Sequence, residues 1–241
     1  MRRLRAILVL TVGLLPASTV KNKLLNLLGH DVHPSAVIAP VVIFMVGRMR
    51  VEEHVLISMG NVFRHLRGVR VGAYTKIGPR NDFWANPKFR HDPDADPEHV
   101  GIFSIGKSAL ITRRHSLDAS GGIVIADWAG LGGRGTTILS HSYDPKRHVM
   151  GCAVTRIGES SFVAAQCSVA VGATLPARSV LAMGAVLMPG AKDAHALYAG
   201  VPARVVRADI SDWKCFEYSE DGTRTRSPEN SLPNRRVLKK S

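Results

Sequence analysis

The chain has 241 residues, which is enough for one large domain or two small ones. Its residues are 45% apolar but only 6% aromatic, and 22 are glycine, a balance that suits narrow stacked coils better than a bulky core. The formal net charge of +13 favours anionic partners, but the sequence has no recognition helix, zinc finger or aromatic-basic sheet signature, so we expect no nucleic-acid partner.

Residues 1–31 form an apolar and then amphipathic segment that we expect to be helical. The apolar run at 6–20 follows three arginines and, at fifteen residues, is too short to span a bilayer comfortably. It continues through Lys21 and Lys23 as an amphipathic stretch that leads directly into the repeats, which argues against a cleaved secretory signal. Two compatible interpretations stay open: a helix that caps the open end of a solenoid, and an interfacial helix on an acidic membrane surface.

A six-residue apolar repeat occupies most of 32–206. It begins in a degenerate first coil and resumes after an irregular stretch at 64–68, with apolar residues at Val32, Ile38, Phe44, Val71, Ile77 and Phe83. A first loop at 85–103, rich in Pro, Asp and His, then interrupts the repeat. The pattern restarts and slips by two residues, with apolar positions at Ile105, Ile111, Leu117, Ile123, Ile125 and Leu131. A second loop at 142–153 precedes the most regular run.

The run at 157–191 is the most regular part of the chain. Aliphatic residues recur every six positions, at Ile157, Val163, Val169, Leu175, Leu181 and Leu187. Four positions after each lies a small residue, at Ser161, Cys167, Ala173, Ser179, Ala185 and Ala191. Six is a multiple of the strand period of two but not of the helical period of 3.6, so the run predicts short strands separated by turns. Such a repeat is one flat side of a parallel β-helix, and with three hexads to a triangular coil we expect five or six coils.

The repeat ends after Leu197. For residues 207–241 we expect a short helix at about 209–218, followed by a polar, basic, proline-containing tail that is disordered.

Three segments resemble a known family. The hexads Ile-Gly-Glu-Ser-Ser-Phe (157–162), Val-Ala-Ala-Gln-Cys-Ser (163–168) and Val-Ala-Val-Gly-Ala-Thr (169–174) look like those of the left-handed β-helix, hexapeptide-repeat acyltransferases. The segment Ile-Leu-Ser-His-Ser-Tyr-Asp-Pro (138–145) resembles the family's His-containing catalytic loop, and Tyr-Ala-Gly-Val-Pro-Ala-Arg-Val-Val (198–206) resembles the segment that closes its acyl-CoA site.

The resemblance covers about 32–206 and implies both a fold and an activity. The fold is an all-β solenoid, a left-handed parallel β-helix with a helical N-terminal segment and a short C-terminal helix and tail. The activity is acyl-CoA-dependent O-acyl transfer, in which acetyl-CoA donates its acetyl group to a hydroxyl of a saccharide, as in the maltose, nodulation and cell-surface polysaccharide O-acetyltransferases. It also implies a homotrimer with each site between two subunits.

The resemblance makes His141 the catalytic residue. It ends a strand where the second loop begins, so a neutral imidazole there can take the proton of an attacking hydroxyl. Asp144 either orients His141 or binds the acceptor, although Asp-Pro is also an ordinary turn initiator. We expect Asp118 and Tyr143 to contact the acceptor; an outward turn carboxylate is the other interpretation of Asp118.

On the donor side, the resemblance assigns Ala165 and Met183 to the edge that holds the pantetheine arm. Gly200 permits the turn over that arm, and Arg204 meets a nucleotide phosphate. The pair Met188-Pro189 departs from the family's common Thr-Lys pair, which puts one phosphate contact in doubt.

Two other classes are weighed against this one. The γ-type carbonic anhydrases share the fold but need three histidine ligands, and His141 and His148 are seven residues apart instead of five. The acidic first loop also lacks fixed ligand spacing, so we expect no metal. A scaffold that has lost its activity is the other alternative.

The three cysteines, Cys152, Cys167 and Cys215, are an odd and scattered set, which predicts a reducing compartment. With the basic, apolar N-terminus, this favours a cytoplasmic protein, peripheral on the inner face of the cell membrane.

Overall fold

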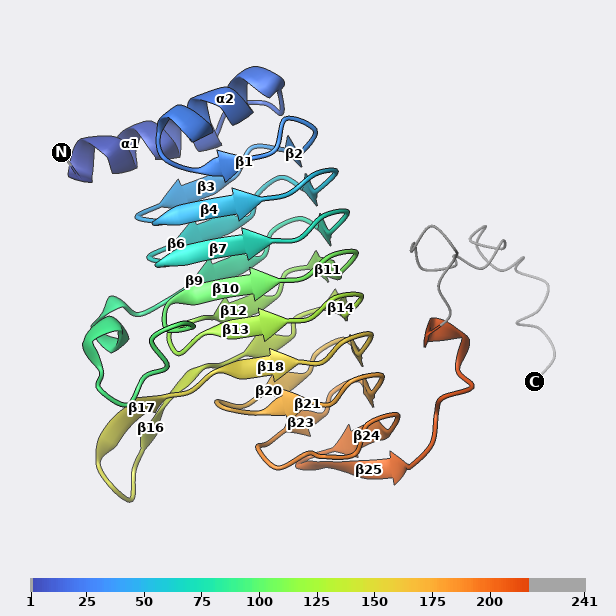
Figure 1. The fold of residues 1–241 in the computed structure, drawn as a ribbon. Helices are drawn as coiled ribbons and strands as arrows, with labels where there is room; N and C mark the ends of the chain where they lie inside the picture. The colour runs from blue at the N-terminus through green and yellow to red at the C-terminus, as the bar shows by residue number, and fades with distance from the viewer. Residues whose placement is uncertain (1, 217–241) are drawn as a thin grey trace.

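The computed structural model describes residues 2–216, which form one stack of flattened coils with two helices across the N-terminal end (Figure 1). The predicted tail at 219–241 lies outside the described residues. Of the segment predicted as a helix, 209–218, the structure describes residues up to 216, and within these it has a 3-10 turn, η2 (Lys214–Phe216), in place of an α-helix. Phe216 packs there against Val180 and Ile210.

The helices α1 (Arg2–Gly13) and α2 (Thr19–Leu27) cover the first coil. Ser18 caps α2 by accepting a hydrogen bond from the backbone N–H of Lys21. The ammonium of Lys21 is buried and donates to the carbonyls of Gly13, Leu15 and Ala39 at 2.7, 2.9 and 2.9 Å. This buried cation ties α1 and α2 to the solenoid, and burial lowers its pKa to about 8.

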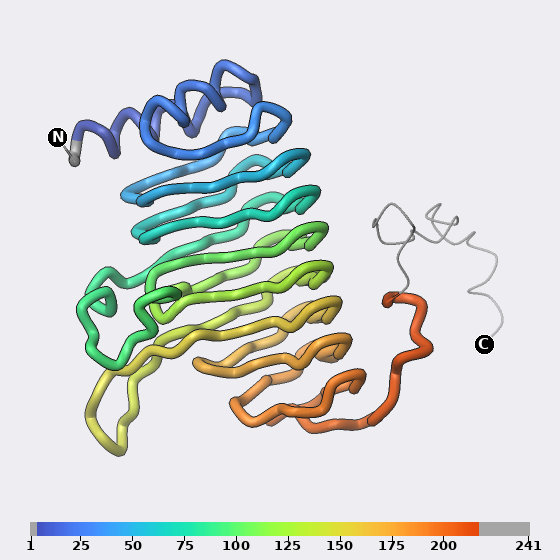
Figure 2. The backbone as a smooth tube through the Cα atoms, in the orientation of Figure 1, coloured from blue at the N-terminus to red at the C-terminus, as the bar shows by residue number. Residues whose placement is uncertain are grey.

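Three sheets of parallel strands form the sides of the coils, and the chain visits them in turn (Figure 2). The first sheet contains β1 (Asp31–Val32), β4 (Arg48–Val51), β7 (Gly68–Val71), β10 (Ile102–Ile105), β13 (Ile123–Ile125), β18 (Thr155–Ile157) and β21 (Thr174–Leu175). The second contains β2 (Val37–Ile38), β5 (Leu56–Ile57), β8 (Lys76–Ile77), β11 (Leu110–Arg113), β14 (Gly130–Arg134), β19 (Phe162–Val163), β22 (Val180–Leu181), β24 (Leu197–Gly200) and the antiparallel β25 (Ala203–Arg207). The third contains β3 (Val42–Phe44), β6 (Val62–Arg64), β9 (Asp82–Trp84), β12 (Ser116–Asp118), β15 (Thr137–Ile138), β20 (Ser168–Val169) and β23 (Val186–Leu187).

The core is a column of the repeat residues. In 157–191 the six aliphatic positions are at most 1% exposed, so the hexad pattern is confirmed. Higher in the column Phe63, Phe83 and Phe103 stack in successive coils, with ring centroids 4.6 and 4.7 Å apart. The fold prediction of a parallel β-helix is therefore confirmed.

Two details of the N-terminal coils differ from the prediction. Ile43 is the buried residue of β3 and Phe44 is 37% exposed, because a one-residue change of register moves a strand residue to the other face. A coil that carries Val51, Ile57 and Phe63 was missed, and the stretch at 64–68 is one of its corners. With seven strands in the first sheet, the part of the chain that is described has more coils than the five or six expected.

Both loops leave the solenoid at the same corner, between the third and first sheets (Figure 1). The first loop joins β9 to β10 and includes the 3-10 turn η1 (Pro87–His91). The second forms an antiparallel hairpin of β16 (His141–Asp144) and β17 (Val149–Cys152), with His141 opposite Cys152.

Candidate active site

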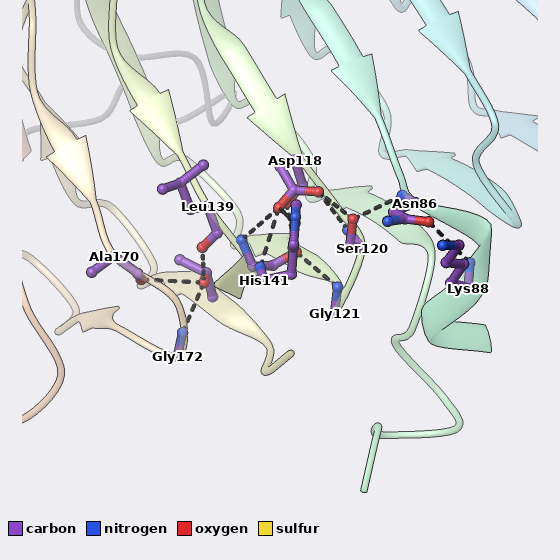
Figure 3. Close-up of polar contacts among 11 residues, drawn as sticks. Asn86, Lys88, Asp118, Ser120, Gly121, Leu139, His141, Ala170 and Gly172 are labelled. Carbon is purple, nitrogen blue, oxygen red and sulfur yellow. Dashed lines mark hydrogen bonds and ion pairs between the residues drawn. The ribbon is translucent and has the colours of Figure 1, made fainter. Parts of the chain in front are cut away.

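His141 and Asp118 form a hydrogen-bonded pair at the corner from which both loops leave (Figure 3). Nδ1 of His141 lies 2.5 Å from Oδ2 of Asp118. The His141 side chain is 17% exposed and that of Asp118 is 1% exposed, so the carboxylate is sealed behind the ring. The two residues are 23 positions apart in sequence but meet because β12 and β15 are neighbours in the third sheet.

The Asp118 carboxylate is an acceptor at every contact. Its Oδ1 accepts from the backbone N–H of Ser120 at 3.0 Å and from the Ser120 hydroxyl at 2.5 Å. Its Oδ2 accepts from the backbone N–H groups of Ser140 and His141, both at 3.2 Å. An ionised carboxylate is an acceptor only, so Nδ1 of His141 must donate the proton between them. A neutral His141 therefore carries its lone pair on Nε2, and no protein group within residues 2–216 forms a hydrogen bond with that atom.

A second layer of hydrogen bonds holds this pair in place (Figure 3). The hydroxyl of Ser140 donates to the backbone carbonyl of Asp118 at 2.6 Å and accepts from the N–H of Gly121 at 2.8 Å. The hydroxyl of Ser120 accepts from the N–H of Asn86, which begins the first loop, at 2.8 Å. Successive coils and both loops are thus linked at the position of the imidazole.

Two aromatic side chains lie against the His141 ring. Trp84 meets it edge-on with ring centroids 5.7 Å apart, and Phe89 lies at 5.1 Å. The guanidinium of Arg64 in turn lies 5.3 Å from the centre of the Trp84 ring. Sequence reasoning missed both aromatic residues. Trp84 could have been found, since it is the register partner of Asp118 in the neighbouring strand, whereas Phe89 has no repeat to place it.

The structure changes the parts assigned to the two aspartates. Asp144 is on the hairpin, where its Oδ1 accepts from the backbone N–H groups of Lys146 and Arg147 at 2.9 and 3.2 Å. It therefore supports a turn, and the prediction that it orients His141 is wrong because Asp118 holds that position. Asp118 is too buried for the predicted acceptor contact, and the alternative of an outward turn carboxylate is also wrong. Tyr143 is exposed, and its hydroxyl lies 2.6 Å from Nδ1 of His148.

The residues assigned to the acyl donor lie elsewhere on the solenoid. Ala165 and Met183 are at the corner between the second and third sheets, where Met183 is 70% exposed. A Cβ atom at Gly133 would collide with Ala165, so only glycine fits beside it in the preceding coil.

Gly200 and Arg204 belong to the β24–β25 hairpin that closes the C-terminal end. Gly200 has a φ of +96°, which favours glycine, as the predicted turn requires. Arg204 lines a cavity of about 340 Å³ with Lys192, Met188 and Pro189. Two cations thus line the cavity in which Met188 and Pro189 replace the expected Thr-Lys pair.

One chain does not bring His141 together with Ala165 and Met183. His141 follows the third sheet in its coil, whereas the other two residues precede it, so they occupy different corners of the triangle. A site that uses both sets of residues needs a second chain.

No metal centre is formed by the residues that the structure describes: no group of three His, Cys, Asp or Glu side chains could hold an ion in 2–216. His115 is buried, and its ring nitrogens contact Thr112 Oγ1 at 2.9 Å and the N–H of Thr136 at 3.1 Å. In the first loop, the Asp96 carboxylate accepts from His99 at 3.0 Å, which lowers the pKa of Asp96. These contacts give the carbonic anhydrase alternative no support.

Comparison with known proteins gives matches at the level of structure. No family model matches the chain, and no curated protein matches its sequence. A mutant of AntD, an N-acyltransferase from Bacillus cereus, in complex with dTDP and coenzyme A, is 15% identical over 69% of this chain and 85% of that chain, with a TM-score of 0.54. Another AntD mutant, in complex with dTDP-4-amino-4,6-dideoxyglucose and coenzyme A, is 14% identical over 69% and 85%, with a TM-score of 0.55. A hexapeptide-repeat acetyltransferase from Vibrio cholerae is 21% identical over 57% and 72%, with a TM-score of 0.46.

The similarity to AntD shows that the chain has the left-handed β-helix fold of the hexapeptide-repeat acyltransferases. A shared fold does not determine the activity, which depends on the side chains at the site.

Proposed function

We propose that the protein is an acyl-CoA-dependent O-acyltransferase that transfers an acetyl group from acetyl-CoA to a saccharide hydroxyl. The observation that carries this proposal is the sealed pair of Asp118 and His141, which leaves Nε2 of His141 without a hydrogen-bond partner among the described residues. AntD is solved with coenzyme A, which supports the choice of donor.

The chemistry needs one proton carrier. Nε2 of His141 takes the proton of the acceptor hydroxyl as its oxygen attacks the thioester carbonyl. The tetrahedral intermediate collapses with cleavage of the carbon–sulfur bond, and the imidazolium returns the proton to the departing sulfur of CoA. Asp118 fixes the ring and stabilises its transient positive charge without itself becoming protonated. Trp84 and Phe89 restrict the ring to one orientation.

The separation of corners supports a homotrimer in which each site lies between two subunits. His141 of one chain would then face the pantetheine edge at Ala165 and Met183 of the next. Light scattering should give three times the 26.1 kDa chain mass, and a monomer with full activity would contradict this arrangement.

Mixing two inactive variants tests the shared site more sharply. Trimers of His141→Ala and of an Ala165→Trp variant should each be inactive. Unfolded, mixed and refolded together, they should regain part of the activity, because some interfaces receive both intact residues. Mixtures of either variant with itself are the matched control and should stay inactive.

The N-terminal helices support a peripheral position on the inner face of the cell membrane. Leu4, Ile7 and Leu8, spaced as one helical face, are exposed on α1, and Leu14 and Leu15 are exposed directly after the helix. The net charge of +13 would attract anionic lipid. No helix among the described residues is long and apolar enough to cross a membrane. Cys152 and Cys167 are free thiols, as a reducing compartment would keep them.

Flotation with vesicles tests this position. The protein should float with vesicles that contain anionic lipid and remain unbound with neutral ones. Replacing Ile7 and Leu8 by serine should abolish flotation without a change in melting temperature, since both side chains already face water. Equal flotation of the double variant would refute the membrane contact.

The activity itself is tested with labelled acetyl-CoA and a panel of acceptors, with hydroxyl and amino sugars in matched pairs, free and nucleotide-linked. Transfer to a hydroxyl that requires His141 supports the proposal. Transfer only to the amino members would replace O-acylation by N-acylation, and failure to bind acetyl-CoA would favour the inactive scaffold.

A further inference from the structure

A groove on the outer face of the first sheet carries a concentration of arginines. It has a volume of about 710 Å³ and lies over β4 and β7, with Pro97 and Glu98 of the first loop as one wall. Four arginines line it, and we call it the arginine groove: Arg48, Arg50, Arg67 and Arg70. None of them contacts His141 or belongs to the predicted acyl-CoA site.

The positive charge of the groove is only partly neutralised. Asp31 pairs with both Arg48 and Arg50, at 3.1 and 3.2 Å. Arg50 and Arg70 are register partners on adjacent strands, and both point outward. Their Cα atoms are therefore about 5 Å apart, and two side chains of like charge lie side by side. Within residues 2–216 no carboxylate pairs with Arg70, so its guanidinium is available to an anion from outside.

Arg67 is held in position with a donor unused. Its Nη2 donates to the carbonyls of Pro97 and Glu98 at 2.7 and 3.0 Å. Its Nε is buried and has no hydrogen-bond partner among the described residues. A buried guanidinium N–H without a partner is costly, and a guanidinium matches the oxygens of a phosphate group.

The first loop connects the arginine groove to His141. Pro97 and Glu98 border the groove, while Phe89 of the same loop packs on the His141 ring. At this corner backbone hydrogen bonds join successive coils: the N–H of Arg67 donates to the carbonyl of Gly101, and the N–H of Gly101 donates to the carbonyl of Ser120. Ser120 lies one coil before Ser140 and His141. Three coil steps correspond to roughly 14 Å along the solenoid, which is longer than one sugar ring, so only a saccharide of more than one ring extends from an anion in the groove to the imidazole.

We propose that the arginine groove binds a phosphate or diphosphate group carried by the acceptor. This names the substrate class of the proposed acyltransferase and rests on that function for its link to His141. The anion engages Arg70 and Arg67, and a saccharide of more than one ring attached to it reaches Nε2 of His141. Two kinds of acceptor share this chemistry, a sugar linked to a nucleoside diphosphate and a sugar linked to a lipid diphosphate.

Binding of small anions tests the groove without any activity. Calorimetry with inorganic pyrophosphate should give a measurable affinity for the wild-type chain, and Arg70→Gln should weaken it at least tenfold. Arg113→Gln, which removes an exposed arginine on the second sheet, is the matched control and should bind as the wild type does. Equal pyrophosphate affinity in all three proteins, or none in any of them, would overturn the proposal.

Two competing ligands identify the source of the phosphate. If uridine diphosphate displaces pyrophosphate, the groove serves nucleotide-linked sugars; if a short prenyl diphosphate does so and uridine diphosphate does not, it serves lipid-linked ones. Displacement by CoA, lost in Arg70→Gln, would assign the groove to the donor and overturn the proposal.

Failure of the groove and failure of the enzyme can be told apart. If pyrophosphate binds through Arg70 but no acceptor is acylated, the acyltransferase proposal fails and the anion site stands. If acylation depends on His141 but Arg70→Gln leaves the KM of phosphate-bearing acceptors unchanged, the groove proposal fails alone. The KM for acetyl-CoA should be the same in Arg70→Gln and the wild type.

Discussion

The two corners at either end of the third sheet follow the same repeat, yet each holds a histidine in a different state. At the corner before the sheet, His115 is buried and both of its ring nitrogens have partners, Thr112 and the backbone of Thr136. At the corner after it, His141 is partly exposed, and among the described residues only its Nδ1 has a hydrogen-bond partner, Asp118. The first histidine completes the core, and the second is free to carry a proton.

The difference comes from what interrupts the repeat. The corner of His115 is kept tight by Gly133 and small residues, which leaves a narrow edge. The corner of His141 is opened by two loops, and Phe89 with Trp84 fills the space around the ring. The regular coils thus stabilise the fold and set the position of the corner, and the two loops that interrupt them create the surroundings of the His141 imidazole. The predictions that follow separate these two contributions.

The largest effect is expected for Asp118→Asn. The NH2 group of Asn replaces one of the two acceptor oxygens, so it faces a donor, either the N–H of Ser120 or the N–H groups of Ser140 and His141, and Asn lacks the charge that stabilises the imidazolium. We expect kcat to fall about 10²–10⁴-fold with little change in KM for either substrate. A loss that appeared in KM alone would contradict a role in positioning His141.

Asp144→Asn is the matched control for that variant. Its carboxylate supports only the turn at Lys146 and Arg147. Kinetics close to those of the wild type are expected, and a large fall in kcat would return the orienting role to Asp144.

Shortening a core residue of a regular coil should lower the stability of the fold and leave kcat unchanged. Leu175→Ala removes a fully buried side chain of β21 and should cost about 2–5 kcal/mol in the free energy of unfolding, measured with urea. The kcat per folded molecule should stay unchanged, since the coil lies outside the His141 corner. Leu175→Met conserves volume and should cost less than about 1.5 kcal/mol. A selective loss of kcat in Leu175→Ala would contradict the claim that the regular coils contribute stability and not catalysis.

Buried His115, at the corner before the third sheet, should make the free energy of unfolding depend on pH. Burial lowers the pKa of His115 to about 4, below the value near 6.5 of an unfolded chain. Between these values the unfolded state binds more protons, so stability is fully present above about pH 6.5 and falls toward pH 4. The full shift corresponds to roughly 3 kcal/mol.

His115→Gln isolates that contribution, because glutamine does not titrate. Urea unfolding between pH 7.5 and 4.5 should show a shallower decline in the variant than in the wild type. His30, whose pKa is also lowered to about 4, by burial and then by Arg5, titrates in both proteins. Identical slopes would show that His115 is not the buried neutral group described here.

The smallest effect is expected at the pantetheine edge. Ala165→Val, a smaller change than the blocking Trp, should raise the KM for acetyl-CoA about tenfold, which is about 1.4 kcal/mol, by narrowing the edge next to Gly133. The KM of the acceptor should not change. A normal KM for acetyl-CoA would remove Ala165 from the donor site.

The regular coils could be predicted from the sequence because every hexad repeats the same burial. Leu175 and its equivalents needed only the period of six, since a buried strand position accepts few other residue types. Near the N-terminus the prediction chose Phe44 over Ile43, because an exposed aromatic residue fits the same apolar pattern as a buried aliphatic one. The pattern fixes the period there, but packing against α1 decides the register.

The site was only partly predictable for a related reason. His141 was found because its segment resembles the family's His-containing loop and stands where the repeat breaks. Asp118 was placed on the acceptor because proximity in sequence favoured Asp144 as the partner of the ring. In a solenoid, residues of adjacent coils are closer than residues three apart in a loop, and the alignment of Leu117 with Ile138 contains that information. Nothing in the sequence aligns Phe89, since loop residues have no register.

The central claim, that His141 is the proton acceptor of an acyl transfer, is tested most directly by measuring turnover and CoA affinity together for His141→Ala. The account predicts that transfer from acetyl-CoA falls about 10²–10⁴-fold while the dissociation constant of CoA, measured by calorimetry, is unchanged. Turnover equal to that of the wild type would contradict it.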